Sequence, residues 1–246
     1  MIPAQPYLPW KVSITILHVV AASSSVLRFE YRRRTHRLWW DDYAAILSAV
    51  IECCPIALIW LRIRRFDDSE HSRHLKIAFT HMSSASFGSI IWWSRISLAL
   101  ALIRITPVWS KVRPWIIGFT CGFILNWIAL VLGMGITCAV NTAWQHVKAD
   151  ILICRPSYGV VLGSLSTNLI GDILLAGFSL YRLWYIKLRP AQRRLVLLVF
   201  STSVLTLIAS VGVGIISYGR VAEGPGALLV WVMAINIEVS NTICVI

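Results

Sequence analysis

The sequence predicts an all-α membrane protein, a bundle of seven transmembrane helices, because seven mostly apolar stretches fill the 246-residue chain. Hydrophobic residues make up 57% of the chain, and its mean hydropathy is +0.72. The stretches are apolar nearly all round, whereas helices of soluble domains carry a polar face. No linker separates them, so residues 1–246 are expected to form a single domain. The expected spans are residues 14–27, 44–61, 86–105, 115–140, 158–183, 195–218 and 227–246.

The first span sets the expected orientation. It is short but can extend back to Trp10 and forward to Phe29. No cleavable signal peptide is visible, because the start of the chain has no basic region and no small-residue cleavage site. Only Lys11 precedes the span, whereas five arginines follow it between residues 28 and 37. By the positive-inside rule the N-terminus therefore faces outward, and after seven spans the C-terminus is cytoplasmic.

Two tryptophans and two aspartates precede the second span. Trp39 and Trp40 are expected to anchor the chain at the headgroup interface. Asp41 and Asp42 suit a helix start, where carboxylates accept free backbone N–H groups and complement the helix dipole. An aspartate-rich metal site is the alternative, but Ala45 stands where its third acid is needed, so no metal is expected. Residues 62–85 are expected to form a long loop before the third span.

Ionisable residues near the middle of four spans are the candidate functional residues. A charge at the membrane centre costs roughly 2.5–3.5 kcal/mol on insertion scales, so it is expected to face the bundle interior and find a partner. Asn168 and Asn241 share helix faces with two of these acids. His18 in the first span is expected to be a packed, hydrogen-bonded histidine rather than a ligand. The four candidates are Glu52, Arg95, Asp172 and Glu238.

One arginine therefore faces three acids. Arg95 is expected to form a bidentate pair with either Asp172 or Glu238. The remaining acids must bond to Asn or Ser side chains, reach water or be protonated. Three roles stay open for this network: a structural lock that orients the bundle, a ligand-binding or switching site, and a proton-transfer site.

Two of the six cysteines, Cys138 and Cys154, flank the outer segment between the fourth and fifth spans. The compartment there is oxidising, so a disulfide is expected, with two free thiols as the alternative. The other four cysteines lie within spans and are expected to behave as small apolar residues.

The net charge of +12 does not indicate a nucleic-acid-binding protein. Basic residues gather at the ends of the spans, where they meet anionic headgroups. The expected partners are the lipid bilayer, a small or lipidic ligand and a cytoplasmic signalling partner. The expected location is the plasma membrane.

An ordered set of short motifs resembles the fungal rhodopsin-domain family, which consists of seven-span, GPCR-like integral membrane proteins. The runs WWDDY at residues 39–43 and WSRISL at residues 93–98 are the most specific pieces. Ser179 departs from the family pattern, which usually has a proline there, so the fifth span is expected to be straighter. The resemblance implies a rhodopsin-like domain. The other landmarks are His18, Arg28, residues 103–105, Cys138, Trp144, Cys154, Asp172, residues 183–184, residues 193–195, Glu238, Asn241 and Cys244.

A receptor-like sensor of a small or lipidic ligand is the first functional hypothesis. It is not expected to be an ordinary rhodopsin-like G-protein-coupled receptor, because the third span ends in Ile103-Arg104-Ile105 instead of an acidic-Arg-Tyr triplet. No cofactor is expected. Retinal needs a lysine in the seventh span for its Schiff base, and all five lysines lie in loops or at span ends.

Two other functions remain as alternatives. The first is an intramembrane enzyme similar to small terpene cyclases, in which a buried acid protonates an apolar substrate. No motif singles out a catalytic pair, so no catalytic residue is assigned. The second is a transporter, which ranks last because the sequence shows no clear repeat, no charged ring and no filter-like segment, and Pro55 in the second span has no clear counterpart in the second half of the chain.

Overall fold

The computed structural model describes residues 8–61, 70–146, 154 and 158–185, and every regular element among them is helical. The sixth and seventh expected spans lie outside the described residues, and so do Glu238 and Asn241. The elements are α1 (Leu8–Arg34), α2 (Trp40–Leu61), α3 (Glu70–Ile105), α4 (Arg113–Val140), the 3-10 helix η1 (Ala143–His146) and α5 (Tyr158–Tyr185).

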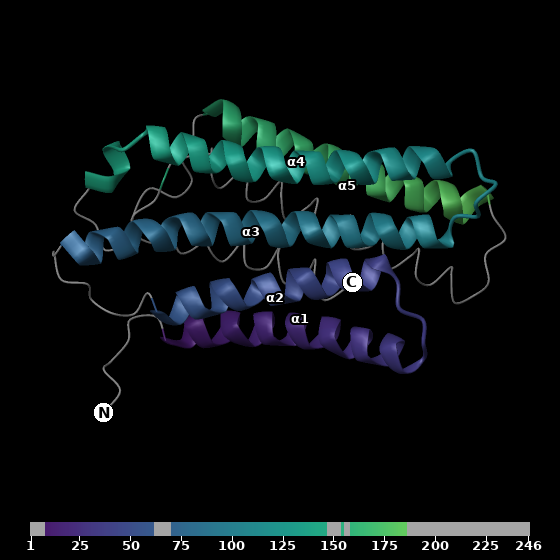
Figure 1. The fold of residues 1–246 in the computed structure, drawn as a ribbon, viewed down its shortest axis with the longest axis horizontal. Helices are drawn as coiled ribbons and strands as arrows, with labels where there is room; N and C mark the ends of the chain where they lie inside the picture. The colour runs from purple at the N-terminus through teal and green to yellow at the C-terminus, as the bar shows by residue number, and fades with distance from the viewer. Residues whose placement is uncertain (1–7, 62–69, 147–153, 155–157, 186–246) are drawn as a thin grey trace.

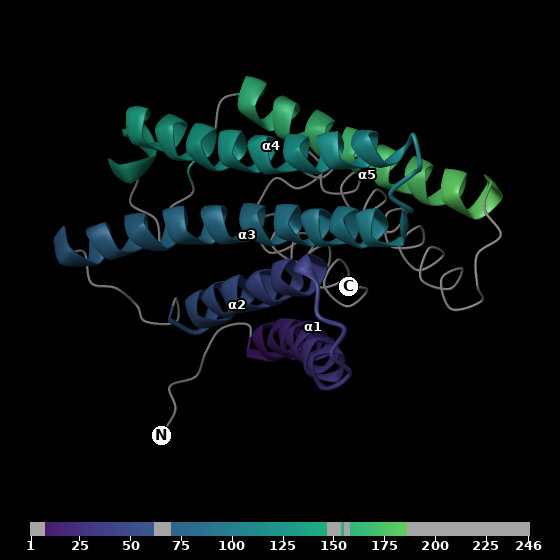
Figure 2. The same cartoon turned by 45° about the vertical axis from the view of Figure 1, so that its right-hand side comes forward.

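Consecutive long helices run in opposite directions, so their connections lie alternately at the two ends of the bundle (Figure 1). Helix α3 occupies the middle: it contacts α2 on one side and α4 and α5 on the other, and α1 packs on α2. Figure 2 shows the same order after rotation, with α5 lying obliquely beside α4. The main hydrophobic cluster surrounds the second half of α3 and includes Trp92, Ile96, Ala99 and Leu102. These residues follow the three- and four-residue spacing of a helix face.

Helix α3 begins earlier than the sequence analysis expected. Residues 70–85, expected to form a loop, belong to a single helix of 36 residues. The segment contains no glycine or proline that would end a helix. Many of its side chains are polar, so hydropathy alone does not predict this part of the helix. At a rise of about 1.5 Å per residue the helix is about 54 Å long, well beyond the roughly 30 Å of a hydrocarbon core.

Three described helices are long and apolar enough to cross a membrane, namely Lys11–Arg34, Arg73–Ile105 and Arg113–Val140. Their burial differs: 72% of the most apolar window of α3 is buried, against 11% for α4. Helix α4 therefore turns large apolar side chains such as Leu125, Leu132 and Ile136 outward. An apolar surface of this kind suits a lipid solvent.

Helix α1 ends in a left-handed residue. His36 has φ 52°, the backbone N–H of Arg37 donates to the carbonyl of Arg32, and that of His36 donates to the carbonyl of Arg33. This is the Schellman pattern, in which glycine usually takes the position of His36. The turn sends the chain directly into α2 and holds the basic end of α1 beside the aspartates that begin α2.

Candidate functional site

The centre of the bundle holds a guanidinium group bound by two helices. Arg95 of α3 donates from Nε to Oδ1 of Asp172 at 3.0 Å and from Nη2 to Oδ2 at 2.9 Å. A third donor, Nη1, reaches Oδ1 of Asn168 at 2.6 Å. Only 2% of Arg95 and 1% of Asp172 are exposed. The sequence left Asp172 and Glu238 open as partners, and the structure pairs Arg95 with Asp172.

Aromatic and glycine residues enclose this pair. The ring of Trp92 lies 5.1 Å from the guanidinium carbon of Arg95, within cation–π range, and packs 5.8 Å from the ring of Phe123. A Cβ atom at Gly171 would lie 3.6 Å from Phe123 and 3.9 Å from Cδ of Arg95. The absent side chain at Gly171 therefore lets the arginine stem lie directly against α5. Sequence reasoning did not identify this glycine.

A second buried contact joins α1 and α2. Nδ1 of His18 lies 2.5 Å from Oε1 of Glu52, and both side chains are 0% exposed. Oε2 of Glu52 has no hydrogen-bond partner among the described residues. Ser48, on the same face of α2, instead donates to the carbonyl of Ala45. Glu52 therefore forms a pair of its own with His18 rather than binding Arg95, a pairing that the sequence did not predict.

At one end of the bundle, two buried aspartates hold three arginines. Oδ2 of Asp41 accepts from Arg28 at 2.9 Å and from Arg32 at 2.6 Å, while Oδ1 of Asp42 accepts from Arg32 at 2.5 Å. Nη1 of Arg104 lies 3.4 Å from Oδ1 of Asp41. Asp41 is 0% exposed and Asp42 is 1% exposed. This arginine–aspartate cluster (Arg28, Arg32, Asp41, Asp42, Arg104) connects α1, α2 and α3.

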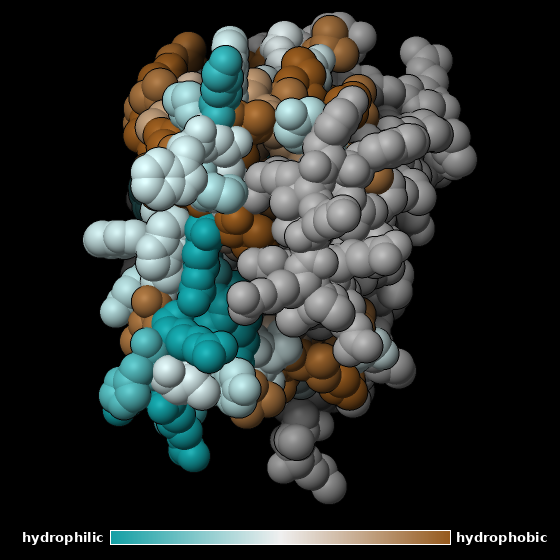
Figure 3. All heavy atoms as spheres, turned by 90° about the vertical axis from the view of Figure 1, so that its right-hand side faces the viewer, coloured by the Kyte–Doolittle hydropathy of each residue, from teal (hydrophilic) through white to brown (hydrophobic). Residues whose placement is uncertain are grey.

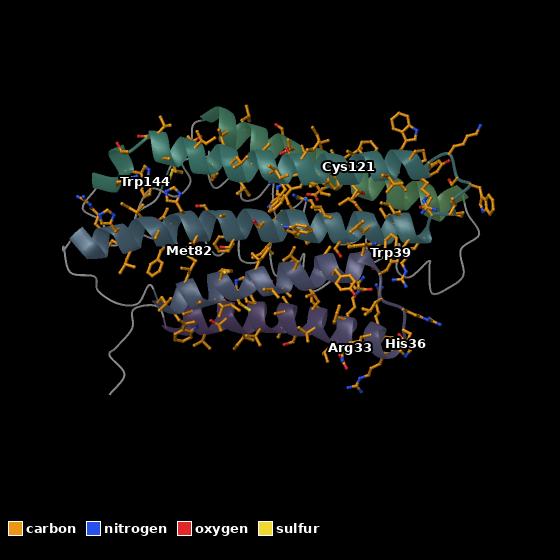
Figure 4. All side chains as sticks on the ribbon, viewed as in Figure 1. Arg33, His36, Trp39, Met82, Cys121 and Trp144 are labelled. Atoms are coloured by element: carbon orange, nitrogen blue, oxygen red, sulfur yellow. A yellow bond between two sulfur atoms is a disulfide. The ribbon has the colours of Figure 1, made fainter. Side chains whose placement is uncertain are left out.

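The two aspartates also serve the start of α2. The backbone N–H of Trp39 donates to Oδ2 of Asp42 at 3.1 Å, in the manner of a capping box. Trp39 is half-buried, and Trp40 is 71% exposed. Ser97 of α3 adds a 2.8 Å hydrogen bond to the backbone carbonyl of Asp41. Figure 4 shows Trp39 at the same end of the bundle as Arg33 and His36.

The opposite end carries a disulfide. Cys138 and Cys154 are bonded across 16 residues, and both are buried. The indole N–H of Trp144 donates to the carbonyl of Cys138 at 3.2 Å, and its ring lies 5.7 Å from His81 of α3. Figure 4 places Trp144 at this end of the bundle. The disulfide closes the segment that contains η1, and the ring of Trp144 holds η1 beside the first half of α3.

The arrangement places charged and polar side chains in contacts between helices. Within residues 8–61, 70–146, 154 and 158–185, no group of three or more His, Cys, Asp or Glu side chains lies close enough to hold a metal ion. The two central pairs are buried polar contacts between different helices. A buried pair of this kind is stable when complete and costly when one partner is lost, so it specifies how the helices pack.

The comparison with protein families gives one match. The model of the fungal rhodopsin domain matches residues 27–221, which includes the arginine–aspartate cluster, Arg95, the disulfide and Asp172. No curated protein matches the chain.

Proposed function

Because the chain belongs to the fungal rhodopsin domain family, we propose that this integral membrane protein is a receptor-like sensor of a small or lipidic ligand. The buried contact between Arg95 and Asp172 carries the proposal, with Asn168 as the third member. Plasma-membrane location and a cytoplasmic signalling partner belong to the same proposal.

The contact suits a switch because it joins two helices through charged groups. Losing one partner of a buried ion pair costs about 3–5 kcal/mol, so α3 and α5 favour discrete arrangements over gradual displacement. A ligand shifts such an equilibrium only by its difference in affinity between the arrangements. A polar ligand group that accepts from the amide N–H2 of Asn168, whose Oδ1 already accepts from Nη1 of Arg95, supplies that difference and leaves the pair with Asp172 intact.

Thermal denaturation in lipid discs tests this proposal. The full chain is heated with sterols, terpenoids, fatty-acid derivatives or plant surface lipids, and each compound is then recovered for mass spectrometry. A ligand at about 100 times its Kd stabilises the native state by about 2.7 kcal/mol. For a protein of this size we expect an increase in Tm of about 5 °C or more.

The variants Asn168→Ala and Glu30→Gln distinguish ligand binding at the proposed site from ligand binding at the surface. Asn168→Ala keeps Arg95 and Asp172 and is expected to reduce the ligand-induced shift. Glu30→Gln changes an exposed pair with Arg34 at one end of the bundle and is expected to leave the shift unchanged. Equal shifts in the wild type and Asn168→Ala would show that the ligand does not use the network.

An intramembrane enzyme is the second candidate, favoured by Glu52. Its Oε2 atom has no partner among the described residues, so a carboxyl proton there is not bonded to any described group. A terpene-cyclase-like reaction begins with proton donation to an apolar substrate, which is general acid catalysis. If a compound from the disc experiment returns isomerised, Glu52→Gln is expected to abolish the conversion while His18 keeps an oxygen acceptor.

A transporter is the least favoured function, and we propose no cofactor. Retinal attachment requires a span lysine, and residues 227–246, the expected seventh span, contain none. Reconstituted protein is therefore expected to show no visible absorbance band after incubation with retinal. A transporter would make ligand flux follow a proton or ion gradient, whereas a sensor would bind the same ligand with no gradient.

A further inference from the structure

An open cleft lies where α3 turns into α4. Its volume is about 340 Å³, and its lining includes Trp39, Arg104, Pro107, Val108 and Arg113. Apolar residues form one part of the lining, and the arginines Arg104 and Arg113 form another. The cleft lies at the same end of the bundle as the arginine–aspartate cluster and borders it at Arg104, which lines the cleft and also contacts Asp41.

The positive charge around the cleft is only partly neutralised. Residues 28–42 and 104–113 contain eight arginines and lysines but only three acids. Arg104 reaches Asp41 and Asp42 only at 3.4 and 3.9 Å, and Arg113 has no ion pair among the described residues. Figure 3 faces this end and shows hydrophilic side chains gathered beside hydrophobic ones. An anion in the cleft therefore meets Arg113, which has no counter-charge among the described residues, and Arg104, whose charge is partly neutralised by Asp41 and whose Nη2 donates to the carbonyl of Arg37.

Exposed tryptophans surround the same end. Trp109 is 93% exposed, Trp40 is 71% exposed and Trp115 is 68% exposed, and Val108 beside the cleft is 73% exposed. Tryptophans concentrate at the headgroup level of a bilayer. Helices α2 and α4 start here and α3 ends here, so these side chains belong to one interface level. The cleft therefore opens at the depth of lipid phosphates rather than in bulk water.

We infer that this cleft binds the phosphate group of an anionic phospholipid through Arg104 and Arg113. The guanidinium fork matches two phosphate oxygens, and the apolar wall accepts the glycerol and the first part of an acyl chain. By the positive-inside rule this end faces the cytoplasm, whose leaflet carries the anionic lipids. The exposed Val108 and Trp109 favour a lipid over a soluble phosphate, because a soluble ligand would leave them in water.

Native mass spectrometry of the full chain tests this assignment. The protein is reconstituted in phosphatidylcholine discs that contain phosphatidylserine, then released in mild detergent, and the retained lipid is measured. Arg113→Gln is expected to weaken phosphatidylserine binding about tenfold, the effect of losing one charge-assisted hydrogen bond. Arg33→Gln removes the same charge from an exposed side chain outside the cleft and is expected to cost less than about threefold, because salt screens it.

A further variant and a competing anion distinguish the possible outcomes of this experiment. Arg113→Lys keeps the charge but loses the fork, so it is expected to bind with intermediate affinity and serves if Arg113→Gln does not fold. Retention of phosphatidylcholine equal to that of phosphatidylserine overturns the inference, as do equal losses in Arg113→Gln and Arg33→Gln. If inorganic phosphate displaces the lipid at equal concentration, the ligand of the cleft is a soluble anion rather than a lipid. Unchanged lipid binding in Arg113→Gln also overturns the inference and leaves the cleft to a soluble partner.

Discussion

Arg95 and Asp172 are 77 residues apart in the chain, yet two hydrogen bonds of 3.0 and 2.9 Å join them across α3 and α5. Neither side chain is more than 2% exposed. The pair therefore links the two helices through a fully buried contact, and its removal is the most direct test of the site.

Asp172→Asn is expected to destabilise the protein strongly, because Arg95 stays charged and buried without its counter-charge. The expected cost is about 3–5 kcal/mol, which lowers Tm by more than about 6 °C for a chain of this size. The double variant Arg95→Met with Asp172→Leu replaces both charges by apolar groups and is expected to recover most of the loss. Thermal denaturation in lipid discs measures all three proteins. A double variant as unstable as the single one would mean that the unpaired charge of Arg95 is not the cause of the loss.

Asp41→Asn is expected to cost far more than Glu30→Gln, although both remove a carboxylate bonded to arginine near the end of α1. Asp41 is fully buried between Arg28 and Arg32, whereas 40% of the Glu30 side chain is exposed. Exposed helix pairs contribute only about 0.3–0.5 kcal/mol. We therefore expect Glu30→Gln to shift Tm by less than about 2 °C and Asp41→Asn by several times more. Similar shifts in the two variants would argue against a structural role for the arginine–aspartate cluster.

Reduction of the bond between Cys138 and Cys154 is expected to lower Tm, because the loop of 16 residues regains freedom in the unfolded chain. Closing a loop of this size by a disulfide raises the free energy of unfolding by about 3 kcal/mol in the chain-entropy model. Reductant is expected to have no effect on the double variant Cys138→Ser with Cys154→Ser. Cys121→Ser, which changes an exposed free cysteine, is expected to keep the full response to reductant. Thermal scans with and without dithiothreitol distinguish these outcomes.

Gly171→Leu is expected to disturb the contact between Arg95 and Asp172, whereas Gly171→Ala is expected to be tolerated. A Cβ atom there meets Phe123 at an ordinary 3.6 Å, but the larger part of a leucine has to displace that ring or the arginine stem. Gly177→Leu is the matched control, since no described atom lies within 4 Å of a Cβ at Gly177. A lower Tm for Gly177→Leu than for Gly171→Leu would contradict the packing described around Arg95.

Hydropathy located four of the helices well and one of them poorly. The apolar stretches at 14–27, 44–61, 115–140 and 158–183 all lie within α1, α2, α4 and α5. Helix α3 was expected at 86–105 but begins at Glu70, because a helix that leaves the hydrocarbon core no longer needs apolar residues. The number of membrane spans and the orientation of the chain remain predictions, since three of the described helices are long and apolar enough to cross a membrane.

Individual pairings were harder to predict than helices. Helical spacing placed Asn168 and Asp172 on one face of α5, and both contact Arg95. It carries no information about contacts between helices, so the partner of Glu52 was not predicted. For the same reason, the sequence predicted the capping role of Asp41 and Asp42 but not their ion pairs. Capping is local, whereas the paired arginines come from α1 and α3.

The uninterrupted length of α3 has a mechanical consequence. One helix without proline carries His81 beside Trp144 in its first half, and Arg95, Ser97 and Arg104 in its second half, where the last two contact Asp41. A rigid rod transmits axial or tilting displacement along its whole length, so no separate relay of side chains is needed. Spectroscopic labels at the two ends of α3 would then report a displacement of the helix simultaneously. A delay between the two signals would reveal a flexible point within the helix.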